Sequence, residues 1–291
     1  MGVKDFYRNN HSKLMWIPLI IILISIGILG FKYFTTGEFI QKDVSLKGGI
    51  STTISTTQEV DAEDLAKFLT SKLNEEVSVR TLRDFTSGDQ VGVIIETSNV
   101  KSSDLKAALK EKITFTDEDF SVEEVSASLG ESFFRQMIIA VIVAFVLISL
   151  TVLVMFRTLI PSLGVVSAAL FDMLFSLSIL SLFEVKLTSA GVAAFLLVMG
   201  YSIDTDILLT TRVLKRSDKE LFERIFDSMK TGSTMSITAI VSLTIGYFFA
   251  TSLVLKQIFL IIILALIFDL FTTWLLNTEI LIRYCKKKNI T

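Results

Sequence analysis

The stretch "GYSIDTDILLTTR", residues 200–212, places Asp204, Asp206 and Arg212 at the end of a run that is otherwise suited only to lipid. A charged side chain at the bilayer centre costs about 2.5 to 3.5 kcal/mol on insertion scales, so it persists where it has a function or a partner. Asp172 and Asp269 lie within two other apolar runs. A carboxyl group in a low-dielectric medium can take up and release a proton as local hydration changes, so these residues are candidates for a proton relay.

Helical spacing separates the two aspartates of the stretch. Residues i, i+4 and i+8 nearly line up on a helix, so Asp204, Leu208 and Arg212 share one stripe while Asp206 points almost the opposite way. We therefore expect unequal roles, in which one aspartate carries the proton and the other bonds neighbouring helices or approaches Arg212. The alternatives are structural: carboxylates that only bond between helices, and an arginine that only anchors the span at the inner surface. An Asp-x-Asp metal site is disfavoured because no His or phosphate-binding feature accompanies the pair.

Composition and hydropathy place the chain in a membrane. It is 51% hydrophobic, with two prolines and 23 phenylalanines among 291 residues. Since about 20 apolar residues cross the hydrocarbon core, six segments qualify as spans, in the pattern of one, a gap, then five: 14–34, 136–156, 158–183, 187–211, 233–252 and 257–282. Cys285 is the only cysteine, which excludes an intrachain disulfide.

Basic residues set the predicted orientation. They gather in the N-terminal tail, between residues 212 and 230, and in the C-terminal tail, whereas the short loops on the other side hold only Lys186 and Lys256. Cytoplasmic loops carry such an excess of Lys and Arg. We expect a multi-pass protein of the cell membrane with both termini in the cytoplasm, the large segment outside it, and His11 solvated in the N-terminal tail. An amphipathic helix over about 217–230 should lie at the inner surface.

The long gap between the first two spans has the pattern of a soluble domain. Strands are predicted at 50–56, 76–84, 90–98 and 120–126, with a hairpin turn at "FTSG" (85–88). Helices are predicted at 61–74, with Asp61 as N-cap, and at 102–113, capped by Ser102 or Ser103. This β-α-β-β-α-β order is the ferredoxin-like arrangement. The predicted fold is an α-helical integral membrane protein with six transmembrane helices and one external α+β domain.

The predicted domains are therefore a tail with the first span (1–34), the external domain (35–132), and a five-helix bundle ending in a basic tail (133–291). Sequence signatures of hydrolases, P-loop NTPases and zinc sites are missing, so neither enzymatic activity nor a cofactor or metal is expected. A basic patch interleaved with aromatic residues is missing too, which disfavours nucleic acid as a partner.

Three motifs resemble SecF, the smaller membrane subunit of the SecDF protein-translocation complex, and in particular its archaeal type. They are "SLKGG" (45–49), "ALFDMLFSLSILSLFEVKLT" (169–188) around Asp172, and "GYSIDTDILLTTR" (200–212). In bacterial members the acidic residue of the last motif stands where this chain has Thr205. The resemblance therefore transfers the proton-carrier role to the neighbourhood of Asp204 and Asp206 rather than cleanly to one residue. Of the two equally near aspartates, we expect Asp206, on the C-terminal side of that position, to be the carrier. It also implies ancestry with proton-driven exporters of the resistance-nodulation-division type.

The resemblance implies a non-enzymatic accessory to protein export that uses proton flux to move its external domain. Gly48 and Gly49 can take backbone angles that other residues resist, so we expect the hinge there; the alternative is a simple turn into the first strand. Implied partners are a SecD-like subunit, the protein-conducting Sec channel, the unfolded secretory polypeptide and membrane lipid. Asp204 and Asp206 would then both face a polar path at the junction with the partner subunit. Two alternatives remain: a homo-oligomeric half-transporter that exports a lipid or small molecule, and a passive scaffold for membrane-protein insertion.

Overall fold

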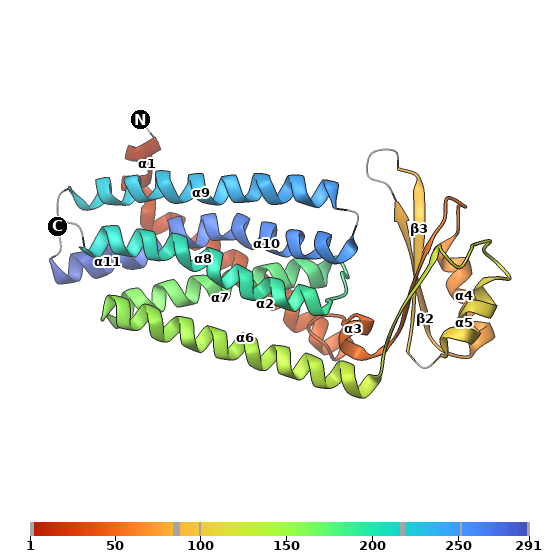
Figure 1. Cartoon of the computed structure of the whole chain (residues 1–291). Helices are drawn as coiled ribbons and strands as arrows, with labels where there is room; N and C mark the ends of the chain where they lie inside the picture. Colours follow the sequence, from red (N-terminus) through yellow and green to blue (C-terminus); the bar gives the residue numbers. More distant parts are fainter. Residues whose placement is uncertain (1–2, 84–87, 99, 216–218, 251, 290–291) are drawn as a thin grey trace. The chain divides into compact units, whose positions relative to one another are not determined.

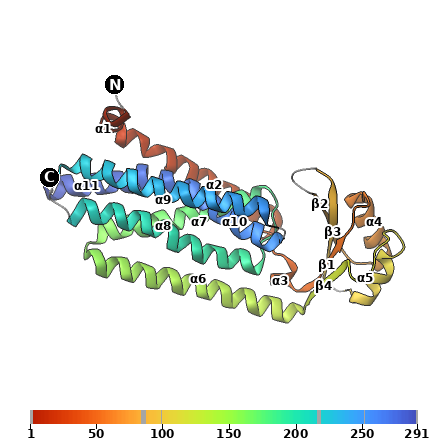
Figure 2. The same ribbon diagram turned by 45° about the horizontal axis from the view of Figure 1, so that its top comes forward.

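The chain folds into two compact units, one of helices and one built on a β-sheet (Figures 1 and 2). The structure is a computed structural model that describes residues 3–83, 88–98, 100–215, 219–250 and 252–289. The helical unit comprises residues Met1–Gln41 and Ile138–Thr291, and the sheet unit comprises Lys42–Met137. The predicted "FTSG" turn lies mostly outside the described residues.

Within the described residues, six helices are long and apolar enough to cross a membrane, which confirms the predicted number of spans. The first consists of α1 (Val3–Leu14) and α2 (Trp16–Thr36). The next four are α6 (Ala127–Phe156), α7 (Leu159–Leu182), α8 (Ser189–Lys215) and α9 (Leu221–Phe249). The last runs through α10 (Leu253–Phe271), the π-helix η1 (Thr272–Asn277) and α11 (Thr278–Lys288).

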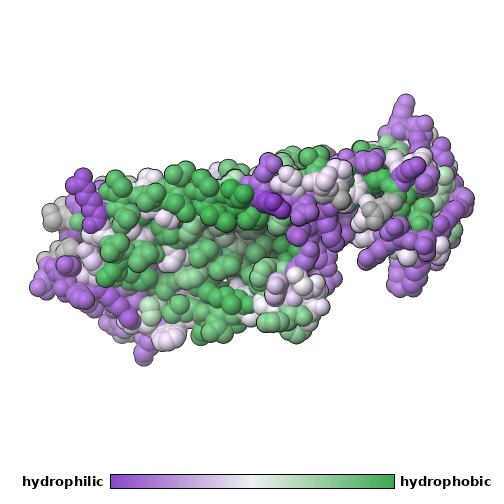
Figure 3. Space-filling model, turned by 90° about the horizontal axis from the view of Figure 1, so that it is seen from below, coloured by the Kyte–Doolittle hydropathy of each residue, from purple (hydrophilic) through white to green (hydrophobic). Residues whose placement is uncertain are grey.

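Burial divides these helices into a centre and a rim. Helix α8 is the most enclosed span and packs against α7, α9 and α10, whereas α6 and α9 are mostly exposed. The surface of the helical unit visible in Figure 3 is largely apolar, and hydrophilic side chains gather at the end where the termini lie. The bundle therefore has polar residues available at its centre and an apolar exterior suited to hydrocarbon.

The segment expected as a separate amphipathic helix at 217–230 is instead part of a span. Residues 217 and 218 lie outside the described residues, but α9 runs without a break from Leu221 to Phe249. Gly232 lies inside this helix and leaves space for the Trp274 ring, since a Cβ at Gly232 would lie 2.5 Å from Cζ2 of that ring. The helix therefore packs closely against the last span at this glycine.

The N-terminal tail is also more ordered than expected. Tyr7 of α1 is buried and donates a hydrogen bond to the Trp274 carbonyl oxygen at 2.5 Å. The prediction that His11 is solvated is wrong, since its side chain is only 13% exposed and bonds Glu279 of α11. Ser12 donates to the same carboxylate at 2.7 Å. A buried carboxylate on the last helix therefore holds the N-terminal helix against the bundle.

The sheet unit has the element order that the sequence predicts. Its strands are β1 (Gly49–Ser55), β2 (Val77–Arg83), β3 (Gln90–Thr97) and β4 (Phe120–Val125), and its helices are α3 (Val44–Lys47), α4 (Ala62–Leu73) and α5 (Ser102–Leu109). The strand order is β2-β3-β1-β4, and every pair is antiparallel.

Helices α4 and α5 lie together on one face of this sheet (Figures 1 and 2) and bury an aliphatic core that includes Ile54, Leu69 and Leu105. The side chain of Asp61 caps α4, as predicted, by accepting hydrogen bonds from the Glu63 and Asp64 amides. The prediction that a serine caps α5 is wrong, because Lys101 holds the N-cap position without a side-chain bond.

Two glycines link α3 to β1. Gly48 has φ of 82° and Gly49 has φ of 128°, a region that L side chains rarely adopt. A Cβ at Gly49 would overlap the Thr97 carbonyl oxygen on the neighbouring strand, and a Cβ at Gly130 would lie 2.6 Å from the Gly48 nitrogen. The "SLKGG" motif therefore allows a left-handed turn and a close backbone approach at the start of the central strand.

A pair of carboxyl groups, one half-buried and one buried, lies beside this turn. Asp43 precedes α3 and neighbours Glu96 of β3, which is 5% exposed and paired with Arg80 of β2. Burial, and then the adjacent Glu96, raise the pKa of Asp43 to about 7. The folded sheet unit consequently retains a proton that an unfolded chain releases near pH 4.

Because the folded state binds the extra proton, its stability should fall as pH rises from about 4 to about 7 and level off above. We expect Asp43→Asn to remove this component. The difference in free energy of unfolding between the wild type and Asp43→Asn should shift by about 1–2 kcal/mol across that window, after allowance for partial exposure. Urea unfolding of a fragment of residues 40–137 at about pH 4 and about pH 7 measures the free energy of unfolding of both proteins. The same change of this free energy with pH in the wild type and in Asp43→Asn would contradict the assignment.

Candidate intramembrane carboxylate site

Three aspartates from three spans meet inside the helical unit. Asp172 of α7, Asp206 of α8 and Asp269 of α10 are each 0% exposed. Asp172 is close enough to both of the others to interact with them electrostatically. Nearby side-chain donors lessen the cost of burying these carboxylates, and Ser202 and Thr273 each interact with two of the three.

Asp172 and Asp269 are both bridged to neighbouring helices by hydroxyl groups. The Ser202 hydroxyl of α8 donates to Asp172 Oδ2 at 2.5 Å, and the Thr272 hydroxyl of η1 donates to Oδ1 at 2.8 Å. Thr205 of α8 lies 3.0 Å from Asp269 Oδ2, and Thr273 donates to Asp269 Oδ1 at 2.9 Å. These bonds link α8 to α7 and to α10 at the same depth in the bundle.

Asp206 is held differently from the other two. Its Oδ1 accepts a hydrogen bond from Asn277 Nδ2 at 2.7 Å, whereas Oδ2 has no direct hydrogen-bond partner among the described residues. Gly164 of α7 makes room for this contact, because a Cβ there would lie 2.6 Å from the Asn277 amide oxygen. Asp206 therefore keeps one buried carboxylate oxygen open to a proton or a water molecule.

The π-helical turn η1 supplies a donor to each of the three carboxylates. Thr272, Thr273 and Asn277 bond Asp172, Asp269 and Asp206, respectively. Isolated π-turns inside α-helices frequently mark functional sites. The sequence analysis missed these donors; the signal for them was the presence of Thr272, Thr273 and Asn277 in an otherwise apolar span.

Asp204 and Arg212 lie outside this cluster. Asp204 is exposed on the surface of the helical unit, while Asp206 is buried, so the two point apart as the helical spacing predicts. Within this chain Asp206 is buried and bonds Asn277. That both aspartates face a polar path at the junction with a partner subunit stays a prediction. Arg212 turns toward α9 and donates through Nη1 to the Asp227 carbonyl oxygen at 2.7 Å and to the Thr231 hydroxyl at 3.0 Å.

Within the described residues, no group of three or more His, Cys, Asp or Glu side chains is arranged to hold a metal ion. The three carboxylates are instead spaced by hydroxyl and amide donors. The arrangement is suited to holding and exchanging protons between carboxyl groups.

We expect Thr272→Val to destabilise the bundle by about 1–2 kcal/mol, because Asp172 loses a buried donor at nearly constant side-chain volume. Thr238→Val is the matched control: the Thr238 hydroxyl is exposed and donates only to the Thr234 carbonyl of its own helix. Denaturant unfolding of the full chain in detergent micelles measures both. Equal effects of the two substitutions would show that the Thr272 bond contributes nothing to stability.

The fold and the site define a polytopic membrane protein with a carboxylate cluster at the centre of a six-span bundle. A family model described as "Protein export membrane protein SecD/SecF, C-terminal" matches residues 104–287. The SecF protein of Pyrococcus furiosus is 33% identical over 287 residues, covering 98% of this chain and 95% of the relative. That of Methanocaldococcus jannaschii is 34% identical over 276 residues, covering 92% and 93%. The chain belongs to the SecD/SecF family of protein export membrane proteins.

Solved structures show the same fold. The crystal structure of SecDF from Thermus thermophilus, a translocon-associated membrane protein, matches with a TM-score of 0.80 at 18% identity. The match covers 98% of this chain but only 40% of the SecDF chain. SecDF in its super-membrane-facing form matches with a TM-score of 0.61, covering 97% of this chain and 39% of that one.

Proposed function

We propose that the chain is the SecF-type subunit of a protein-export complex and that it couples export to proton movement through Asp172, Asp206 and Asp269. The observation that carries the proposal is the burial of three neighbouring carboxyl groups, one of which leaves an oxygen without a direct partner. If these positions only packed helices together, neutral Asn or Ser would be sufficient, because these residues carry no charge that must be neutralised. Three adjacent carboxyl groups in a dry interior share protons because like charges in low dielectric repel.

Asp206 is the proton carrier in this account. Asp172 and Asp269 each accept bonds from two hydroxyl groups, one on α8 and one on η1. The open Oδ2 of Asp206 can instead take up a proton without first breaking a bond. Loading and unloading of this proton alters the attraction of α8 for η1, and we infer that this change is the mechanical step.

The exposed face of α8 is the contact surface for a SecD-like subunit. Leu197, Tyr201 and Asp204 are exposed along it at membrane depth. An intramembrane carboxylate on a bundle surface costs several kcal/mol against lipid, so a second membrane chain with a polar group is its expected partner. A homo-oligomeric transporter would cover the same face with a second copy of this chain.

The sheet unit, Lys42–Met137, is proposed to be the external domain expected at residues 35–132: a ferredoxin-like domain outside the cytoplasm that handles the emerging unfolded polypeptide beside the Sec channel. Its strand order and its two helices on one face support the ferredoxin-like assignment. The basic residues in the tails and between α8 and α9 support cytoplasmic termini.

We propose that the sheet unit moves about Gly48 and Gly49. Spin labels at Ser71→Cys on α4 and Phe183→Cys after α7, with Cys285 replaced by Ser, report the distance between the units. Glycines tolerate backbone angles that other residues resist, so the chain can bend at Gly48 and Gly49. We therefore expect the distribution of distances between the two labels in proteoliposomes to shift when a proton gradient is applied. An unchanged distribution with an intact gradient would rule out movement at this site.

The proton assignment is tested by Asp206→Asn, which keeps size and hydrogen bonding but loses the titratable group. We expect the gradient-dependent part of export to fall about tenfold or more. Export of a secretory protein with and without an uncoupler measures this quantity.

The matched control is Asp204→Asn, two residues away on the same helix but outside the cluster. It should keep gradient-dependent export, and both variants should still co-purify with the SecD-like subunit. Normal dependence of export on the proton gradient in Asp206→Asn would show that the three aspartates serve only to pack the helices. Assembly of this chain only with itself would favour the half-transporter.

A further inference from the structure

A positively charged pocket lies between α8 and α9, apart from the carboxylate cluster. Its volume is about 490 Å³, and its lining is formed by Arg212, Asp227, Lys230, Thr231, Thr234 and Met235. The pocket is near the end of α8 and the start of α9, at the end of the helical unit where both chain termini lie (Figure 1). Basic pockets between transmembrane helices on the cytoplasmic side bind anionic lipid headgroups.

The two basic side chains of this pocket have unused donors. Arg212 uses only Nη1, on the Asp227 carbonyl and the Thr231 hydroxyl, so its Nε and Nη2 donors have no acceptor among the described residues. Lys230 is exposed and makes no ion pair with any residue that the structure describes. A guanidinium with free parallel N–H groups matches the geometry of a phosphate.

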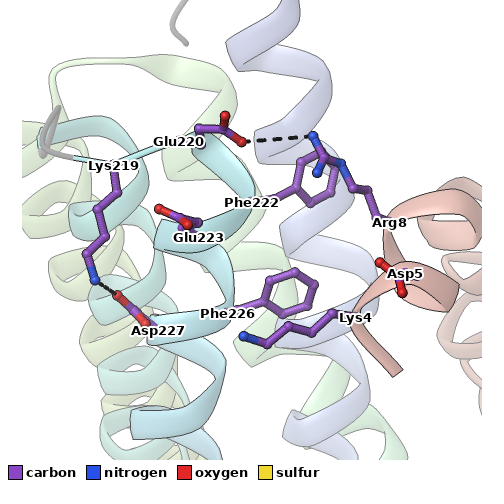
Figure 4. A pocket seen from close by; sticks show the side chains of 9 residues that line it. All are labelled: Lys4, Asp5, Arg8, Lys219, Glu220, Phe222, Glu223, Phe226 and Asp227. Carbon is purple, nitrogen blue, oxygen red and sulfur yellow. Dashed lines mark hydrogen bonds and ion pairs between the residues drawn. The ribbon is translucent and has the colours of Figure 1, made fainter. Parts of the chain in front are cut away.

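The one carboxylate in the lining is already neutralised. Asp227 Oδ2 is 2.5 Å from the Lys219 ammonium, as Figure 4 shows. The pocket thus keeps the net positive charge of Arg212 and Lys230. Met235, which is 49% exposed, adds an apolar wall that suits the glycerol or acyl part of a lipid.

The neighbouring pocket between α1 and α9 has no such excess of charge. Its basic and acidic side chains nearly balance, and Arg8 pairs with Glu220 as Lys219 does with Asp227 (Figure 4). Charge complementarity therefore selects the Arg212 pocket as the anion site.

We propose that the pocket between α8 and α9 binds the phosphate headgroup of an anionic membrane phospholipid, held by Arg212 and Lys230. A lipid rather than free phosphate is the ligand because the site lies where spanning helices emerge from the bilayer and includes an exposed apolar wall. The bound headgroup bridges α8, which carries Asp206, to the exposed helix α9. The inference does not depend on proton coupling.

The test is native mass spectrometry of the full chain, reconstituted with equal amounts of phosphatidylglycerol and phosphatidylcholine and released in mild detergent. We expect the wild type to retain phosphatidylglycerol selectively. Arg212→Gln with Lys230→Gln should reduce that retention about 25-fold, since each basic residue near the surface contributes about fivefold. Lys230→Gln alone changes an exposed side chain without an ion pair, so it tests the site even where the double variant fails to fold, with an expected loss of about fivefold.

The matched control is Lys286→Gln with Lys287→Gln, which removes the same charge from the exposed tail of α11. Retention within about twofold of wild type in this control supports a defined site. An equal loss in both double variants would mean general surface attraction and would overturn the proposal. Unchanged retention in the Lys230 variant, or displacement of the lipid by millimolar inorganic phosphate, would also overturn it.

Discussion

The architecture of the bundle depends on placing three carboxyl groups in a medium that cannot solvate them. Asp172, Asp206 and Asp269 come from three helices, and one π-helical turn provides a donor to each. On a regular α-helix Thr272, Thr273 and Asn277 would spread over about 140° around the axis, and the wider π-turn brings them closer together. The irregular turn is tolerated because it is enclosed by protein rather than facing lipid.

This constraint explains why α8 occupies the centre. Ser202 and Thr205 reach the aspartates of α7 and α10, while Asp206 of the same helix reaches η1. Small residues on the neighbouring helices let the backbones approach: Gly164 accommodates Asn277, and Gly232 accommodates Trp274. A change in the protonation of Asp172 or Asp206 would therefore alter bonds between different spans.

Hydropathy was sufficient to predict six spans, and alternation with turn residues predicted the sheet unit, because both patterns depend on local periodicity. Helical spacing also separated Asp204 from Asp206 correctly. Features set by contacts distant in sequence were missed: the π-turn, the close packing of α9 at Gly232, and the burial of His11 against Glu279. Each depends on a partner more than 35 residues away, which no local pattern encodes.

The central claim is that the cluster exchanges a proton at Asp206. Isotope-edited infrared spectroscopy of aspartate carboxyl groups, on the full chain in lipid nanodiscs between about pH 4 and pH 9, tests it most directly. On an Asp43→Asn background, which removes the titration of the sheet unit, the account predicts a protonated-carboxyl band that changes reversibly with pH, loses intensity in Asp206→Asn and is unchanged in Asp204→Asn. A band that is insensitive to pH, or one that is unchanged by Asp206→Asn, would contradict it.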